Sequence, residues 1–467
     1  MINTNKKDYI WSYLAYFLKF GINFFIFPVV LRLLSPYEYG LWVTFSSLGT
    51  IVNLFDFGFS STILRNISYV WSGAQSLQKN GHENIKVEKQ KNERLFVITL
   101  QTCRKIYLYS SLLAACISLF IITGYILYII RDMFRVEYVI AWLLYAINIC
   151  LNLYFAYWPV ALRAVGAIEE AQKATILGFL LQLIISYVGL LHGGGLVALS
   201  IAGCLCGTSI RIASIYYFKR YENIGEILVK FKNEIKKSEI SHTMKILWFN
   251  AKKAGISSIA TIVMAQSTTL ICSAYYGVEI TGMYGLCYQL LTMLVSVSQI
   301  YYQTTMPKLT QLRIEGNLKE SQKKFSMSVL IGWFLFFIGV GAIILCGNPI
   351  FKFMGSQVEL NLQLFIIIAL YSFGEMNYSM HASYISLDNQ LPFVKSVIYT
   401  AIVVVIVSLV MAKYSIDFWV LLLMRCICEM FYMFWKWPFE AHKLLQINML
   451  QILHIGYQEI RRVIKMG

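Results

Sequence analysis

Charged side chains occur inside several long apolar runs of this sequence, where an ionised group is expensive. In the stretch "FDFGFSS", Asp56 lies within such a run and Arg65 follows on the same run. A charge in hydrocarbon is retained when it faces a partner or a water-filled cavity, so these positions are candidates for binding or translocation. The candidates are Lys19, Asp56, Arg65, Arg211, Lys252, Glu375, Arg425 and Glu429.

Several of these charges also have a structural explanation. Arg211 lies near the end of its apolar run and could extend its charge to the membrane surface. Arg425 and Glu429 are one helical turn apart and could neutralise each other. Arg65 and Lys252 lie at the edges of runs, where basic residues commonly anchor a helix.

Lys19 lies near the middle of its run without a carboxylate one turn away, which favours a cavity-lining role. His192 and His381 are isolated histidines near predicted helix ends, and a hydrogen-bonded structural role is the simpler explanation. "LHGGGL" (residues 191–196) resembles an oxyanion-hole loop, but the G-x-S-x-G element that accompanies it is missing, so we expect a tight turn. The sequence contains no P-loop and no metal-ligand spacing among its cysteines, and it predicts neither an enzyme nor a cofactor.

The amino-acid composition indicates that much of the protein surface faces lipid. Of 467 residues, 58% are hydrophobic and only 14% are charged. A soluble domain is nearer half apolar and a quarter charged, so the excess apolar surface must face lipid. The net charge of +16 then belongs to loops facing anionic lipid rather than to a nucleic-acid interface.

Apolar runs of about 20 residues predict roughly twelve membrane-spanning helices and an all-α polytopic fold. The predicted spans are 9–33, 40–64, 106–130, 138–162, 174–192, 195–217, 254–276, 281–305, 325–346, 360–385, 396–412 and 417–436. The connections on one side are long and basic and carry roughly thirty of the 40 Lys and Arg residues, which predicts that both termini are cytoplasmic. The stretches 224–237 and 444–467 have the spacing of amphipathic helices that lie on the membrane surface.

A short repeat divides the predicted spans into two halves. "YGL" at residues 39–41 and again at 284–286 begins corresponding spans, six apart. This pattern predicts two pseudo-symmetric lobes of six helices, residues 1–245 and 246–440, followed by a cytoplasmic amphipathic tail, residues 441–467.

The N-terminal motifs resemble those of Wzx-type flippases, which transport polysaccharide and O-antigen repeat units and belong to the multidrug/oligosaccharidyl-lipid/polysaccharide exporter (MOP) superfamily. The shared elements are "RLL" (32–34), "YGLW" (39–42), "DFGF" (56–59) and "RNIS" (65–68), and "ALRAVGAIEEAQKATI" (161–176) resembles a family connector. The long charged loop between Arg65 and Lys105 departs from the family pattern.

The resemblance implies a flippase that moves undecaprenyl-pyrophosphate-linked oligosaccharide across the bacterial cytoplasmic membrane by alternating access, with a polysaccharide polymerase as a possible partner. It implies cations that bind the pyrophosphate, for which Lys19, Arg65, Arg211, Lys252 and Arg425 are candidates, with Asp56 orienting one of them. Proton or sodium coupling would use Asp56 or Glu375.

Two other functions stay open at this point. A multidrug antiporter of the same superfamily would need an acidic, aromatic-lined cavity, whereas the charges inside the predicted spans are mainly basic. A polysaccharide polymerase or membrane glycosyltransferase would need a large outward loop with catalytic residues, and the longest outward loop is only "GNPIFKFMGSQVEL".

Overall fold

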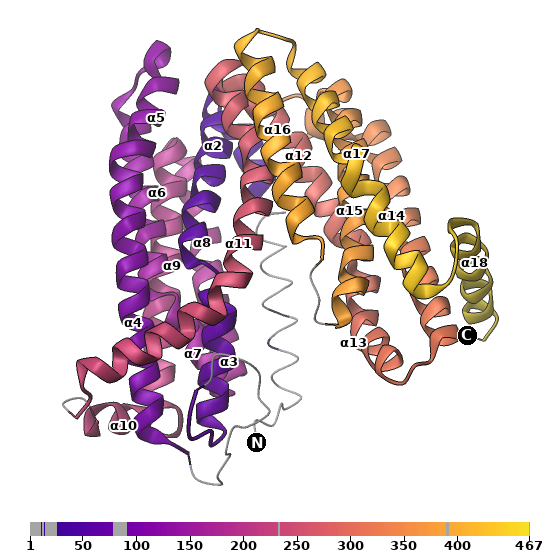
Figure 1. Cartoon of the computed structure of the whole chain (residues 1–467). Coiled ribbons are helices and arrows are strands. Elements are labelled where there is room, and N and C mark those ends of the chain that lie inside the picture. The colour runs from indigo at the N-terminus through magenta and orange to yellow at the C-terminus, as the bar shows by residue number, and fades with distance from the viewer. Residues whose placement is uncertain are drawn as a thin grey trace. The chain divides into compact units, whose positions relative to one another are not determined.

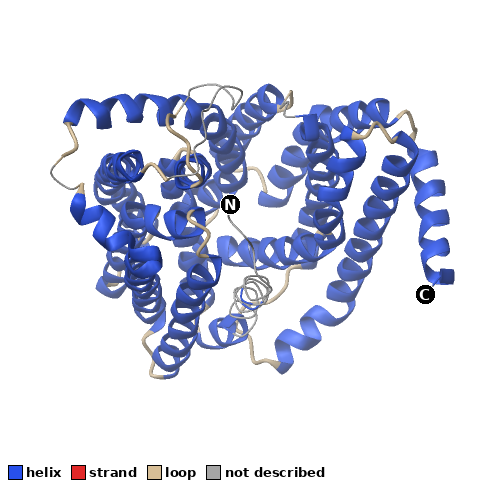
Figure 2. Cartoon of the chain, turned by 90° about the horizontal axis from the view of Figure 1, so that it is seen from below, coloured by secondary structure: helices blue, strands red, loops and turns tan. Residues whose placement is uncertain are grey.

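The computed structural model describes residues 26–77, 91–231, 234–388 and 392–466, together with Trp11 and Leu14. Most of the first predicted span, including Lys19, lies outside the described residues. The described residues fold as helices and connecting turns, without a β-strand (Figure 2). The predicted all-α class is therefore confirmed.

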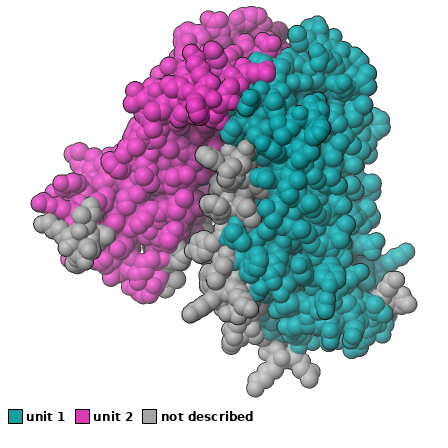
Figure 3. Space-filling view, turned by 180° about the vertical axis from the view of Figure 1, so that it is seen from behind, with its two compact units in different colours: residues 1–266 teal, residues 267–467 magenta. Residues whose placement is uncertain are grey.

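The chain divides into two compact units, residues 1–266 and 267–467 (Figure 3). The predicted boundary at residue 245 falls inside helix α11 (Lys237–Tyr275), which contributes to both units. The proposed six-plus-six symmetry of the lobes stays a prediction.

The first unit combines packing of consecutive helices, α8 on α9, with packing of helices further apart in sequence, α6 on α9 and α3 on α7 (Figure 1). Residues 26–33 are also helical. Its helices are α2 (Pro36–Val52), α3 (Phe59–Trp71), α4 (Glu93–Cys116), α5 (Thr123–Ile129), α6 (Val136–Phe155), α7 (Tyr157–Ala164), α8 (Ile168–Leu191), α9 (Gly195–Arg220) and α10 (Ile224–Lys230).

The second unit contains the end of α11 and the helices that follow it, with α15 packed on α17, α16 on α17 and α14 on α18. Its helices are α12 (Val278–Ser298), α13 (Ile300–Ile314), α14 (Leu318–Phe353), α15 (Leu362–Ile385), α16 (Val394–Lys413), α17 (Phe418–Leu445) and α18 (Met449–Met466).

Local sequence explains several helix ends. Ser35 and Glu38 form a reciprocal capping box at the start of α2, and Pro36 occupies the first helical position. The predicted turn at "HGGG" is confirmed, because α8 ends at Leu191, α9 begins at Gly195, and Gly193 has a φ of 76°.

Eight described helical segments are long and apolar enough to cross a bilayer. They are Glu93–Ile129, Val136–Ala164, Ile168–Leu191, Gly195–Lys230, Val278–Ser298, Leu318–Phe353, Val394–Lys413 and Phe418–Leu445. Large aromatic side chains such as Phe120 and Phe334 are 78% and 65% exposed, which suits lipid and would be a liability in water. The chain is thus a multi-pass membrane protein.

The other four predicted spans behave differently. Residues 9–33 are largely outside the described part, and 254–276 corresponds to the apolar end of α11, Ile259–Tyr275. Residues 360–385 form α15, and 40–64 is interrupted by a 3₁₀ turn, Asn53–Asp56.

Two predicted continuous helices are interrupted in the structure. The expectation that 40–64 forms one continuous helix is wrong. The single helix expected over 281–305 is also wrong, because α12 ends at Ser298 and α13 follows it from Ile300. The amphipathic segment after Ile224 is also shorter than expected, because α10 ends at Lys230.

Candidate functional site

Asp56 lies at a break in the second predicted span. A 3₁₀ turn, Asn53–Asp56, precedes Phe57 and Gly58, which have φ values of 47° and 69°. The Asp56 Oδ1 atom accepts hydrogen bonds from the Tyr107 hydroxyl (2.5 Å) and the Ser60 hydroxyl (3.0 Å), and Oδ2 accepts from the Ser60 backbone N–H (3.3 Å). The carboxylate therefore caps the new helix α3, whose open N–H groups favour a negative charge.

Helix α11 packs directly against this break. The Trp248 ring lies 5.9 Å from the Phe57 ring and 5.7 Å from the Phe59 ring, between centroids. A Cβ atom on Gly255 would lie 2.8 Å from the Phe57 carbonyl oxygen, so glycine is needed for the close approach. This packing stabilises the left-handed Phe57, a conformation that costs a non-glycine residue about 1–2 kcal/mol.

Arg211 is a buried cation whose hydrogen-bond partners are amide groups. Its side chain on α9 is 7% exposed, which does not fit the expectation that it extends to the membrane surface. Nε and Nη2 donate to the Asn152 Oδ1 atom at 3.1 and 2.6 Å, and Nη2 also donates to the Asn148 Oδ1 atom at 3.2 Å. No carboxylate of the described residues forms an ion pair with it. Within the described part of the chain, the positive charge is thus hydrogen-bonded but not neutralised.

Gly207 makes room for this arrangement one turn before Arg211 on α9. A Cβ atom there would lie 2.5 Å from the Asn152 Oδ1 atom and 2.8 Å from the Arg211 Nη2 atom. The Asn152 amide in turn donates to the Asn148 Oδ1 atom at 3.0 Å, which fixes the orientation of both amides.

Arg425 in the second unit is buried in a different electrostatic setting. Its side chain is 1% exposed, and Nε donates to Glu429 at 2.9 Å while Nη2 donates to Glu375 at 3.2 Å. Nη1 donates to the Thr268 hydroxyl at 2.8 Å, and the guanidinium lies 4.5 Å from the centre of the Tyr371 ring. The predicted pairing of Arg425 with Glu429 is confirmed, and Glu375 joins the same cluster.

The Arg425 cluster carries one more carboxylate than cations. Glu429 is fully buried, and its Oε2 atom has no hydrogen-bond partner among the described residues. The Glu375 side chain is 31% exposed. One bound proton or one monovalent cation would bring the formal charge of the cluster to zero.

The remaining predicted site residues do not join these clusters. Arg65 on α3 and Lys252 on α11 are exposed, as expected for residues at the edges of spans. Lys19 lies outside the described residues. Asp56 forms no ion pair with a described residue, so the cation expected beside it is not found within that part of the chain.

Sequence reasoning missed the neutral residues that hold the charges. Asn148 and Asn152 occur one turn apart in the apolar stretch "WLLYAINICLNLYF", a pattern that indicates a polar stripe on one helix face. The sequence does not identify the other neutral partners of these charges, because threonine and tyrosine are common in membrane helices; these partners are Tyr107, Thr268 and Tyr371.

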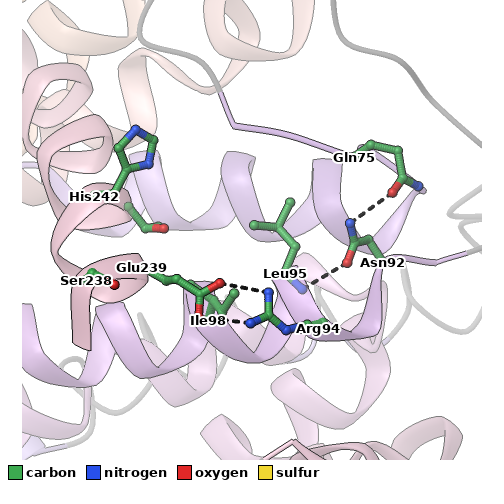
Figure 4. A pocket seen from close by; sticks show the side chains of 9 residues that line it. Gln75, Asn92, Arg94, Leu95, Ile98, Ser238, Glu239 and His242 are labelled. Carbon is green, nitrogen blue, oxygen red and sulfur yellow. Dashed lines mark hydrogen bonds and ion pairs between the residues drawn. The ribbon is translucent and has the colours of Figure 1, made fainter. Parts of the chain in front are cut away.

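A separate cavity of about 560 Å³ lies in the first unit between the starts of α4 and α11. Arg94 and Glu239 form a two-pronged ion pair at its wall, with N–O distances of 2.8 and 2.9 Å, and the Asn92 amide donates to Gln75 (Figure 4). The backbone N–H of Lys236 and the Arg94 guanidinium lower the pKa of the Glu239 carboxyl. None of the predicted site residues lines this cavity.

Comparison with known proteins places the fold and the family. A family profile described as "Polysaccharide biosynthesis protein" matches residues 6–313, which is more than half of the chain. The chain belongs to this family. The match covers the N-terminal motifs on which the resemblance to Wzx-type flippases depends, and that resemblance is confirmed. No curated protein sequence matches the chain significantly.

Two solved transporter structures have a fold similar to that of this protein. One is an inward-facing multidrug resistance MATE family transporter of the MOP superfamily, with a TM-score of 0.67, 13% identity, and coverage of 91% of this chain and 94% of that one. Another is the lipid II flippase MurJ in an inward closed conformation, with a TM-score of 0.60, 12% identity, and coverage of 96% and 90%. At these identities the likeness establishes the fold that the chain has in common with these two transporters.

Proposed function

We propose that this protein is a flippase that moves undecaprenyl-pyrophosphate-linked oligosaccharide repeat units from the cytoplasmic to the periplasmic leaflet by alternating access. Membership of a polysaccharide biosynthesis family supports a lipid-linked glycan as cargo. The fold shared with a structure described as a lipid II flippase is consistent with it. In this proposal the polyprenyl tail stays in lipid while the charged headgroup and sugars cross through protein.

The observation that carries the proposal is the charge of Arg211, which no described carboxylate neutralises. A pyrophosphate cannot enter hydrocarbon without groups that replace its hydration, because transferring an isolated ion to a low-dielectric medium costs about 20 kcal/mol. Arg211 is buried and hydrogen-bonded by two amides, and no described carboxylate competes for its charge. The two amides take the Nε and Nη2 donors, so the Nη1 donors are the ones without an acceptor among the described residues, and these could bind a phosphate oxygen with a charge-assisted hydrogen bond.

The other cations take secondary places in this proposal. Arg65 and Lys252 are exposed and could receive the headgroup at the membrane edge, and Lys19 is retained as a residue of the path. Arg425 is a weaker candidate for the pyrophosphate, because Glu375 and Glu429 already neutralise it.

We assign ion coupling to the Arg425 cluster, with Glu375 as the group that binds and releases the ion. Glu375 is the partly exposed carboxylate of the two, and one cation would neutralise the cluster. Asp56 is the alternative, although its contacts are those of a helix cap. The ion would be a proton or sodium, and Glu375→Gln should abolish the response of transport to the ion gradient that drives it.

The proposed setting is the bacterial cytoplasmic membrane with both termini in the cytoplasm. The basic connections support this orientation, since positively charged loops stay on the cytoplasmic side. A polysaccharide polymerase would then receive the cargo on the outer face.

A reconstituted system tests the proposal against the multidrug alternative. Purified protein in proteoliposomes would receive either fluorescent undecaprenyl-pyrophosphate-linked oligosaccharide or the organic cation ethidium. We expect the lipid-linked glycan to change leaflet and ethidium to stay, with Arg211→Gln abolishing the flipping and Arg211→Lys retaining part of it. Transport of ethidium without flipping of the glycan would refute the proposal.

A further inference from the structure

Helix α18 packs against α14 (Figure 1). Ile452 is fully buried, and a Cβ atom on Gly456 would lie 2.8 Å from the Ser326 carbonyl oxygen of α14. Glu459 is 8% exposed, and its carboxylate lies 3.8 Å from the Lys324 ammonium. The helix is thus held against α14 with a fixed rotation about its own axis.

That rotation leaves an apolar strip uncovered beside the docking face. Met449, Leu450, Leu453 and Tyr457 are 44%, 75%, 38% and 61% exposed. Their spacing of one, three and four residues puts them in one sector of roughly 100° on a helix with 3.6 residues per turn. We call these four residues the α18 strip.

Polar and basic residues cover the sector on the far side of the strip. Gln451, His454, Gln458 and Arg461 are exposed there, and Arg462 is also exposed. The order around the helix is therefore docking face, apolar strip and polar face. A helix that only faced water would have no reason to present the four large side chains of the α18 strip, whereas a helix at a membrane surface requires this order.

The docking position places the strip near the level at which lipid begins. α18 contacts α14 at Ser326 and also at Leu330, because a Cβ atom on Gly456 would lie 3.3 Å from the Leu330 Cβ atom. The first large side chain exposed further along α14 is Phe334, which is four residues, or about 6 Å along the helix axis, beyond Leu330. The polar layer of one leaflet is about 5–8 Å thick outside the hydrocarbon, so this part of α18 lies at the level of the headgroup layer.

We propose that the α18 strip inserts into the boundary between headgroups and acyl chains, and that Arg461 and Arg462 bind the headgroups of anionic lipids. The occupant is the leaflet of the membrane that the protein itself spans. Each arginine near an anionic membrane surface strengthens binding to that surface by about fivefold. This inference depends on the membrane-spanning fold and is independent of the proposed cargo.

Site-specific photocrosslinking in the intact protein tests the assignment. The photoreactive residue p-benzoylphenylalanine would replace Leu450, Tyr457 or Gln458 in separate variants, each reconstituted in nanodiscs of phosphatidylglycerol or phosphatidylcholine. Mass spectrometry would then measure lipid adducts on α18. Gln458 is the matched control, because it is exposed on the polar face of the same helix.

We expect adducts at least tenfold more abundant at residues 450 and 457 than at 458, with more adducts in phosphatidylglycerol. The combined Arg461→Gln and Arg462→Gln variant should lose this preference for the anionic lipid. Equal adducts at all three positions would overturn the proposal, since they would indicate no defined insertion. A crosslink from residue 450 to a second protein copy would also overturn it, because the strip would then be a protein interface.

Discussion

Replacing Arg211 with methionine should abolish transport while leaving stability almost unchanged. Replacing a residue that only stabilises the fold should instead lower both the transport rate and the stability. Arg211→Met removes the guanidinium but keeps an unbranched apolar side chain that can fill most of the same volume between α9 and α6.

Two opposing contributions decide the stability of this variant. Removing a buried charge that has no counter-charge relieves a desolvation penalty, and apolar replacements of buried ionic groups are neutral or stabilising by about 1–4 kcal/mol. The Asn152 Oδ1 atom, which accepts from Arg211 at 2.6 and 3.1 Å, loses those donors, and an unsatisfied buried acceptor costs about 1–3 kcal/mol. Because the two nearly cancel, we expect the free energy of unfolding to change by less than about 1 kcal/mol.

Arg425→Met is the matched control, because Arg425 is buried to a similar degree but between two carboxylates. Removing it leaves the fully buried Glu429 and the partly exposed Glu375 without a cation, and breaking a buried ion pair in this way costs about 3–5 kcal/mol. At roughly 2–4 °C per kcal/mol for a unit of this size, its Tm should fall by about 6–20 °C. The Tm of Arg211→Met should stay close to that of the parent protein.

The assay combines thermal unfolding in detergent with the flipping of fluorescent lipid-linked oligosaccharide in proteoliposomes. Loss of flipping with an unchanged Tm would assign Arg211 to the transport path. If Arg211→Met lowers the Tm as much as Arg425→Met does, then the charge is structural and the reasoning fails. Normal flipping by Arg211→Met would remove this residue from the path.

Two further predictions concern the first unit. Gly207→Ala places a methyl group 2.8 Å from the Arg211 guanidinium, so flipping in proteoliposomes should fall at least tenfold, although alanine is favoured over glycine in a helix by about 1 kcal/mol. Gly203→Ala is the control, because its nearest contact would be at 3.3 Å, and it should flip normally. Equal flipping rates in the two variants would contradict this account. The lowered pKa of Glu239 means that its contribution to stability is complete above its ordinary pKa and is lost only as the pH falls through the lowered value. Double-mutant cycles with Arg94→Gln and Glu239→Gln should therefore measure the same coupling at pH 7.5 and pH 5.5, and a marked decrease at pH 5.5 would show that the pair does not hold.

The helical class and several local contacts could be predicted from the sequence because they depend on short-range chemistry. Lipid-compatible composition and run length determine the class, and the pair Arg425–Glu429 follows from one helical turn. The turn at residues 192–194 follows from its glycines. In each case the interacting residues are neighbours in sequence, so spacing alone specifies the contact.

The break at Phe57 and Gly58 could not be predicted with the same tools. An apolar run predicts a continuous helix, and a left-handed phenylalanine is favoured only when a distant segment packs against it. The local signal is the Asp-x-Gly pattern at residues 56–58, but in an apolar run this pattern is equally typical of a charge that faces a cavity and of a cap for a new helix.

The partners of Arg211 were hidden for a related reason. Asn148 and Asn152 lie on α6, about sixty residues from Arg211 in sequence, and only the packing of α6 on α9 brings them together. The same holds for Thr268 and Glu375, which reach Arg425 from α11 and α15. Sequence identified the charges, but the tertiary packing determines which of them are neutralised.

The joint at Phe57 and Gly58 restricts which substitutions this segment can accept over evolution. Valine or isoleucine at position 57 would be selected against, because branching at Cβ makes the left-handed backbone costlier still, whereas asparagine or glycine would be tolerated. Position 255 would be confined to glycine by the carbonyl oxygen that faces it. Related sequences that keep the break at residues 57 and 58 should therefore also keep glycine at position 255, although that position is nearly two hundred residues away along the chain.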